Sequence, residues 1–199
     1  MAILVGTDID CLLLVMKKVV YIEGAHAMDN GDLRKAFSKL FEKELHGNMP
    51  KVIMGDGKNQ TIDKFHTAPL VQNEQRFLLV DSDAPVDDKA AVCAGFNANQ
   101  PNGKLKCRLD NTFLMIQEAE AWILSQPEVL NRHNISTAKL SRRNAMEISN
   151  PSEMLALLYK DSGKYYHKVR DFSILLPELD TTKLKEYFKE FDELIERLR

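Results

Sequence analysis

The sequence has 199 residues, with 27 Lys and Arg side chains against 29 Asp and Glu side chains and a formal net charge of −2. This length allows one domain with a substantial core, and the near-zero charge excludes a molecule held on nucleic acid by its overall field. The three cysteines are an odd number without a Cys-x-x-Cys spacing, which argues against a disulfide framework or a structural zinc site and favours a cytoplasmic protein.

The first fifteen residues contain an apolar run that starts at Cys11 and reaches Met16. Asp8 and Asp10 precede it instead of basic residues, and it is far shorter than the roughly 20 residues that span a bilayer. We therefore expect neither a signal peptide nor a membrane anchor. Residues 1–15 are interpreted as an upstream-start extension or as an additional edge strand.

Three short segments have the composition of buried strands, namely residues 17–24, 50–58 and 76–80. Two helical patterns separate them: residues 30–47, with apolar side chains at helical spacing, and residues 59–70, which stop at a proline. The order β-α-β-α-β predicts right-handed crossovers and a parallel sheet.

The remaining chain is predicted to be mostly helical. Residues 84–110 are polar and indicate a loop with at most one short helix, whereas residues 111–126 are apolar nearly all round and predict one buried helix. A further helix should start at Asn150 as N-cap, with Pro151 at its first position and Glu153 placed as in a capping box. Residues 180–199 predict a final amphipathic helix whose apolar stripe is core or a partner surface.

Acidic side chains follow the first and third predicted strands. Glu23 ends the first, and Asp81 and Asp83 follow the third, so the parallel arrangement puts them at one sheet edge. Residues i and i+2 of an extended segment point the same way, so both aspartates should converge with Glu23. Their repulsion would be relieved by a divalent cation, for which Mg²⁺ is the natural candidate. The alternative is a solvated turn, which we retain for Asp8 and Asp10.

Two further acids lie in residues 111–126. On one helix Glu118 and Glu120 would be about 200° apart and could not face the same site. Each has apolar neighbours, so one of them is expected to be a buried acid with a cation or basic partner, while the other reaches solvent.

These motifs resemble the Toprim fold of topoisomerases, bacterial primases, recombination-repair proteins and nucleases of the overcoming-lysogenisation-defect class. The chain is more closely similar, over residues 17–199, to the small stand-alone Toprim-like proteins catalogued as domain of unknown function 4276. The segments that carry this resemblance are YIEG, GDGK, VDSD, EAWIL, NPSE and YYHK.

The resemblance implies a Toprim-like, Rossmann-like α/β fold with a mostly parallel sheet flanked by helices. It implies a catalytic core over residues 16–126 and a helical part over 127–199 packed on it. It also implies Mg²⁺ or Mn²⁺ held by Asp81 and Asp83, with Glu23 as a ligand or general acid/base. It selects Glu120 over Glu118 as a further metal-site acid, and it matches Lys168 to a basic position of the family pattern.

The activity that we expect is metal-assisted cleavage of a phosphodiester bond in DNA or RNA. The resemblance adds an ATPase partner of the AAA or chromosome-maintenance (SMC) type in antiviral phage defence, and a homo-oligomer is compatible with it. Two rival functions stay open: a metal-binding regulatory module that docks on such an ATPase, and a primase-like nucleotidyltransferase.

Several other side chains are weaker candidates for the site. Lys58, Arg142 and Arg143 are basic groups that could hold a nucleic-acid strand, although exposed basic side chains are the norm. His26 lies close to Glu23 in sequence but could equally cap the next helix. The Gly55-Asp56-Gly57 segment is interpreted as a plain strand-to-helix turn, because the P-loop pattern is absent.

Overall fold

The computed structural model describes residues 16–25, 30–140 and 145–199. Residues 1–15, for which the sequence left an extension or an edge strand open, lie outside the described residues, as do His26, Arg142 and Arg143. Of the helices in the described ranges, none combines the length and apolar character needed to cross a membrane.

The described residues form one four-stranded sheet in which every pairing is parallel. Its strands are β1 (Lys17–Ile22), β2 (Lys51–Met54), β3 (Glu74–Asp81) and β4 (Thr112–Met115), arranged in the order β2-β1-β3-β4. The parallel α/β sheet predicted from the sequence is therefore confirmed, and it has a fourth strand that the sequence did not indicate.

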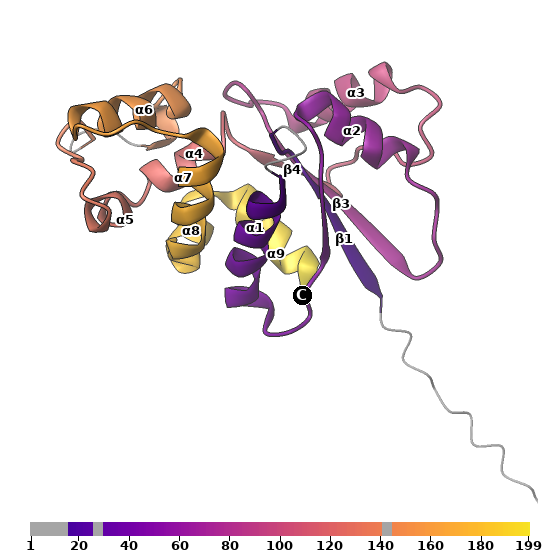
Figure 1. Ribbon diagram of the computed structural model, residues 1–199. Helices are drawn as coiled ribbons and strands as arrows, with labels where there is room; N and C mark the ends of the chain where they lie inside the picture. The colour runs from indigo at the N-terminus through magenta and orange to yellow at the C-terminus, as the bar shows by residue number, and fades with distance from the viewer. Residues whose placement is uncertain (1–15, 26–29, 141–144) are drawn as a thin grey trace, which may run out of the picture.

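Helices connect consecutive strands and cover both faces of the sheet (Figure 1). They are α1 (Asn30–Leu45), α2 (Lys58–Thr67) and α3 (Lys89–Asn99). The chain leaves β1 to form β2 on one side and returns to form β3 on the other, so the strand order reverses at the β1–β3 boundary. In doubly wound sheets such a switch point opens a crevice at the carboxyl ends of the strands, where ligands bind.

Successive side chains of each strand point to opposite faces of the sheet, so the core consists of two apolar clusters. Val20 and Leu79 belong to the apolar cluster beneath α1 and the C-terminal helices. Tyr21 and Leu78 belong to the cluster beneath α2 and α3, where the ring of Tyr21 meets that of Phe65 edge to face. Because both faces of the sheet are covered, its strands are apolar on both sides, as expected for a parallel sheet.

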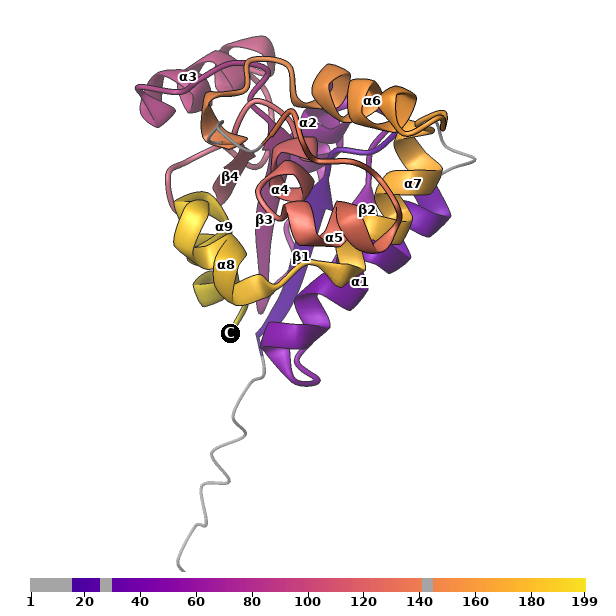
Figure 2. The same ribbon diagram turned by 90° about the vertical axis from the view of Figure 1, so that its left-hand side faces the viewer.

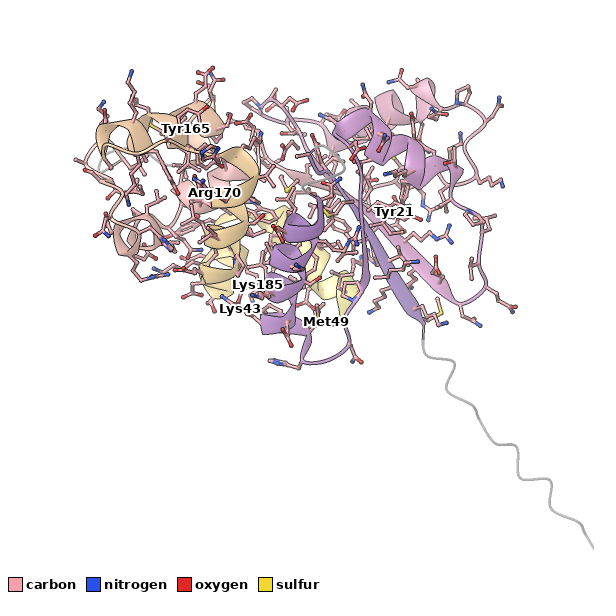
Figure 3. The ribbon with its side chains drawn as sticks, in the orientation of Figure 1. Tyr21, Lys43, Met49, Tyr165, Arg170 and Lys185 are labelled. Carbon is pink, nitrogen blue, oxygen red and sulfur yellow. The ribbon has the colours of Figure 1, made fainter. Side chains whose placement is uncertain are left out.

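The helices that follow the sheet share the first of these clusters, and those within residues 168–198 pack on α1 (Figure 2). Lys43 of α1 donates to the Leu179 carbonyl at 2.8 Å, and Lys185 pairs with Glu44 of α1 at 2.8 Å (Figure 3). The helical elements are α4 (Glu120–Leu124), α5 (Pro127–Arg132), α6 (Pro151–Asp161), α7 (Lys168–Leu175), α8 (Thr181–Tyr187) and α9 (Lys189–Leu198), with 3₁₀ turns at Ala145–Glu147 and Leu176–Glu178.

The prediction of one helix over residues 111–126 is wrong. Thr112–Met115 form strand β4, and the helix α4 starts only at Glu120. All four residues of β4 are buried, with Phe113 and Met115 on the α1 side of the sheet and Leu114 on the other. A strand that is apolar on both faces has the same composition as a buried helix, so periodicity alone could not separate the two.

Two other predictions change in detail. Residues 84–110 contain an eleven-residue helix, α3, whose N-cap Asp88 accepts from the amides of Ala90 and Ala91. The single C-terminal helix is broken at Phe188, whose extended backbone separates α8 from α9. The apolar stripe of this region is core, apart from the half-exposed Tyr187. Asn150 is the N-cap of α6 and Pro151 its first residue, as predicted.

Candidate active site

Glu23 and Asp81 meet at the switch point of the sheet. Glu23 directly follows β1, and its amide donates to the Leu79 carbonyl at 2.9 Å, which continues the β1–β3 pairing. Asp81 is the last residue of β3, and its amide donates to Oε2 of Glu23 at 3.0 Å. The two acids predicted to share a sheet edge are therefore in contact through a hydrogen bond.

Gly24 allows the loops after β1 and β2 to pack together next to Glu23 and Asp81. The Gly57 amide donates to the Gly24 carbonyl at 3.0 Å. A Cβ atom at Gly24 would lie 2.6 Å from the Gly55 carbonyl oxygen and 2.2 Å from Oδ1 of Asn30, so no larger residue fits. The glycine after the strand glutamate is thus required by close packing of the backbone.

Asn30, the first residue of α1, helps to form the site. Its Oδ1 accepts from the Ala25 amide at 3.1 Å, and its Nδ2 donates to the Gly55 carbonyl at 3.2 Å and to Oδ1 of Asp56 at 2.8 Å. One buried amide therefore ties together the two loops that flank Glu23. Its burial and its partners from a distant loop depend on tertiary contacts and leave no mark in the local sequence.

Glu120 and Lys168 complete the group from the helical part of the chain. Glu120, the first residue of α4, is only 1% exposed, and Nζ of Lys168, the first residue of α7, lies 3.4 Å from its Oε1. The hydroxyl of Tyr166 donates to the same oxygen at 3.4 Å. A cavity of about 80 Å³ separates these residues from the strand acids and is lined by Glu23, Gly24, Ala25, Leu33, Asp81, Ala119, Glu120, Lys168, Val169 and Phe172.

Burial and neighbouring negative charges raise the pKa values of the carboxylates that line this cavity. Burial raises the pKa of Asp81 well above its usual range, and the charges of Glu23 and Glu120 raise it further. The pKa values of Glu23 and Glu120 are also raised, in each case mainly by burial. Burial opposes the charge of Lys168, but the attraction of Glu120 and Asp81 outweighs it and raises its pKa.

Asp83 does not converge with Asp81 as predicted. The strand ends at Asp81, and Asp83 has a left-handed backbone with φ of 60°, so the alternation of an extended segment no longer applies. Its carboxylate is 68% exposed and pairs with Nζ of Lys58 at 2.8 Å. This ion pair still lies close enough to Glu23 for both charges to act on its pKa. Asp83 and Lys58 therefore form the rim of the site.

Glu118 and Glu120 do not share a helix, and neither is simply solvated, since each has its own partners. Glu118 lies in the turn before α4, and its carboxylate accepts from the Ser152 amide at 2.7 Å and from the Ser152 hydroxyl at 3.0 Å. It thus caps the N-terminus of α6, where a negative charge is favourable. Glu153, predicted to complete a capping box, instead accepts from the side-chain amide of Asn150.

Two of these carboxylates have the arrangement that a divalent cation needs. Within residues 16–25, 30–140 and 145–199, no three or more His, Cys, Asp or Glu side chains are arranged to hold a metal ion, and Asp83 is turned away from the other acids. Magnesium, however, often takes only one or two carboxylates and completes its shell with water and phosphate oxygens. Glu23 and Asp81 each use one oxygen for a backbone amide, and the described contacts give the second oxygen no donor. The pair fits such a site.

The fold and this group of acids define an α/β protein with a doubly wound parallel sheet and a buried carboxylate cluster at its switch point. The chain belongs to the family described as Domain of unknown function (DUF4276), whose model matches residues 23–199. No curated protein and no solved structure matches it. The closest family resemblance found in the sequence is therefore confirmed, and every acid that lines the cavity lies within the match.

Proposed function

We propose that this protein is a magnesium-dependent nuclease that hydrolyses phosphodiester bonds at the cavity between β1, β3 and α4. The observation that carries the proposal is the unbalanced charge of the site. Its four carboxylates and two ammonium groups leave a formal charge of −2, and the pKa values of Asp81, Glu23 and Glu120 are raised. One divalent cation would balance this charge.

Glu23 and Asp81 are the residues that would hold the cation, since both reach the cavity and lie at the carboxyl ends of adjacent strands. When bound, Mg²⁺ or Mn²⁺ supplies positive charge that stabilises the negative charge developing on a phosphate in the transition state. The crevice of a doubly wound sheet is the place where a phosphate ligand is expected.

The protein's own residues supply positioning and proton transfer. Lys168 keeps 59% of its side-chain surface exposed, so its ammonium group can leave Glu120 in part and contact a phosphate oxygen. Glu120, whose pKa is raised mainly by burial, is the acid of the cavity suited to accept and return a proton. Lys58 and Asp83 at the rim would orient the strand as it enters.

The resemblance of the sequence motifs to the Toprim fold supports nucleic acid as the substrate class. It also supports an ATPase partner of the AAA or SMC type and a cytoplasmic role in phage defence. These parts of the proposal rest on that resemblance, whereas the metal site and the reacting groups rest on the geometry.

The test is cleavage of supercoiled DNA, single-stranded DNA and tRNA by the full chain, with Mg²⁺, Mn²⁺ or EDTA, alone and with an ATPase encoded next to it. We expect metal-dependent cutting that Asp81→Asn and Glu23→Gln reduce at least 100-fold, a typical loss for a group that acts on the transition state. Glu118→Gln is the matched control, since this acid caps α6 outside the cavity. Cleavage that survives both site variants would contradict the proposal.

Assays on the same purified proteins distinguish the nuclease from the two rival functions. Co-purification with the ATPase without cleavage of any substrate would favour the regulatory module. Synthesis of primers from nucleotides on a single-stranded template would favour the nucleotidyltransferase.

A further inference from the structure

A second hollow lies on the other side of α7 from the acidic cavity. Its volume is about 390 Å³, and we call it the α7 hollow. Its lining includes Lys164, Tyr165, His167, Arg170, Asp171 and Ile174. Tyr165 and Arg170 are labelled in the part of the molecule formed by α6 and α7 (Figure 3). None of these residues lines the acidic cavity.

The α7 hollow presents an aromatic ring to solvent. Tyr165 is 74% exposed, and its ring contacts that of His167 edge to face with centroids 4.8 Å apart. Ile174, half exposed, adds apolar surface to the same hollow. An exposed aromatic ring is a surface on which a planar group such as a nucleic-acid base can stack.

The hollow is also locally basic in a chain of net negative charge. Lys164 donates to the His133 carbonyl at 2.6 Å, and no carboxylate among the described residues forms an ion pair with it. Arg170 pairs with Asp171 at 2.8 Å, yet 61% of its side-chain surface is exposed. Two cations and one anion thus line the hollow, which favours a negatively charged ligand such as a phosphate.

Helix α7 joins the hollow to the proposed active site. Lys168 and Phe172 line the acidic cavity, whereas Arg170 and Ile174, two residues further along in each case, line the hollow. Residues two apart lie about 200° around a helix, so α7 presents one face to each site. The two sites are separated by roughly the 10–12 Å width of a helix, which a strand of a few nucleotides can span.

We infer that the α7 hollow binds an unpaired nucleotide of the substrate, with its base stacked on Tyr165 and its phosphate held by Lys164 and Arg170. This inference rests on the proposed nuclease function and adds that the substrate is single-stranded DNA or RNA, or a duplex with an unpaired segment. A protein partner fits less well, because Tyr165 and Ile174 offer too little apolar surface for the core of an interface.

The test is binding of fluorescently labelled oligonucleotides of about 15 nucleotides, long enough to cover the binding track of a typical single-strand domain. Single-stranded DNA, single-stranded RNA and duplex DNA are compared by anisotropy in EDTA, so that no cleavage is involved. We expect single strands to bind more tightly than duplex. Tyr165→Ala should weaken single-strand binding by roughly 5- to 150-fold, the effect of removing one stacked base. Tyr165→Phe, which keeps the ring, should bind like the wild type.

Tyr187→Ala is the matched control, because Tyr187 also reaches the surface but lies on α8, outside the hollow. Circular dichroism checks the fold of each variant, and the exposure of Tyr165 makes unfolding by its replacement unexpected. Equal binding of single strands and duplex, or an equal effect of Tyr165→Ala and Tyr187→Ala, would overturn the inference.

The outcome is separable from that of the proposed function. Metal-dependent cleavage of duplex without Tyr165-dependent binding would leave the nuclease standing and remove the α7 hollow. Tyr165-dependent binding of single strands without any cleavage would support the hollow and remove the nuclease.

Discussion

The backbone amide of Asp81 donates a hydrogen bond of 3.0 Å to the carboxylate of Glu23, which lies 58 residues earlier in the chain. This contact holds the Glu23 side chain against the end of β3, next to the buried carboxyl group of Asp81. The fold therefore keeps the two acids together, although burial and the charge of Glu23 raise the pKa of Asp81. Such repulsion costs stability and is relieved by a cation or by neutralising one acid.

Asp81→Asn is expected to stabilise the protein in the absence of divalent cations. Asparagine keeps an acceptor for the Ala119 amide, now bonded to Oδ1 of Asp81 at 2.9 Å, and removes a buried negative charge. The free energy of unfolding should rise by about 1–3 kcal/mol, the scale of an uncompensated buried polar group. Urea denaturation in EDTA measures it. Asp110→Asn is the control, because Asp110 is an exposed acid just before β4, at the amino ends of the strands. It should change stability by less than about 0.5 kcal/mol.

Addition of Mg²⁺ should raise the melting temperature of the wild type and leave that of Asp81→Asn nearly unchanged. A ligand that binds only the folded state at about 100 times its Kd adds about 2.7 kcal/mol of stability. For a chain of this size, about 2–4 °C per kcal/mol is expected. Differential scanning fluorimetry at increasing Mg²⁺ concentration provides the measurement. Equal shifts in both proteins would place the cation elsewhere.

The cation-free protein should be more stable at mildly acidic than at neutral pH. The pKa values of Asp81, Glu23 and Glu120 are raised above the ordinary 3.8 and 4.5, so the folded chain holds these protons more tightly than the unfolded chain. Stability therefore increases as the pH falls from neutral through the folded pKa values, and this gain is complete below the unfolded ones.

Acids with lowered pKa act in the opposite sense at lower pH. Asp171 and Glu178 are stabilised by hydrogen bonds to basic groups, so their contribution is present above the unfolded pKa and is lost as the pH falls through the folded pKa. Urea denaturation in EDTA at about pH 5.5 and about pH 7.5 tests the upper limb of this dependence. Asp81→Asn should flatten the difference; a wild type that is more stable at the higher pH would contradict it.

Glu118 and Glu120 form a matched pair for separating structure from function. Glu118→Gln weakens the cap on α6 and should cost about 0.5–2 kcal/mol while leaving the response to Mg²⁺ intact. Glu120→Gln should instead leave stability unchanged or higher and abolish cleavage, because it lines the cavity. Melting curves and cleavage assays on both variants decide the assignment. The reverse pattern would mean that the wrong acid has been assigned to the site.

Glu190 of α9 accepts a hydrogen bond from β4, the strand at one edge of the sheet. Its Oε2 accepts from the Leu114 amide of β4 at 3.1 Å and from Nζ of Lys89 at 2.7 Å. Glu190→Ala leaves both donors without this acceptor and should destabilise the protein by about 1–3 kcal/mol. It should also promote aggregation, which light scattering would detect, because an exposed edge strand invites pairing. Glu193→Ala, at an exposed position of the same helix, should have little effect on either measurement.

The sequence predicted the elements whose periodicity is unambiguous. The β-branched run of β1, the amphipathic pattern of α1 and the Asn150-Pro151 start of α6 were recognisable because each depends on neighbouring residues. β4 was missed because burial on both faces removes the alternation that marks a strand. The break at Phe188 was missed because the apolar stripe continues through it into α9.

The sequence could predict only those residues of the site that lie at the ends of predicted strands. Glu23 and Asp81 lie together because the carboxyl ends of parallel strands share an edge, and strand order follows from the connections. The turn of Asp83 towards Lys58, the cap that Glu118 forms on α6 and the role of Asn30 were not predictable. Each is decided by a contact with a residue far away in the chain.

By itself the sequence determined an α/β chain, its family, and the acids that a parallel sheet brings to one edge, because composition and periodicity act over a few residues. Only the tertiary structure decided which acids face the cavity, since burial and opposing charge depend on how α6 packs on α4 and α7 packs on α1. The same packing places Lys168 next to Glu120 and Tyr165 on the opposite side of α7.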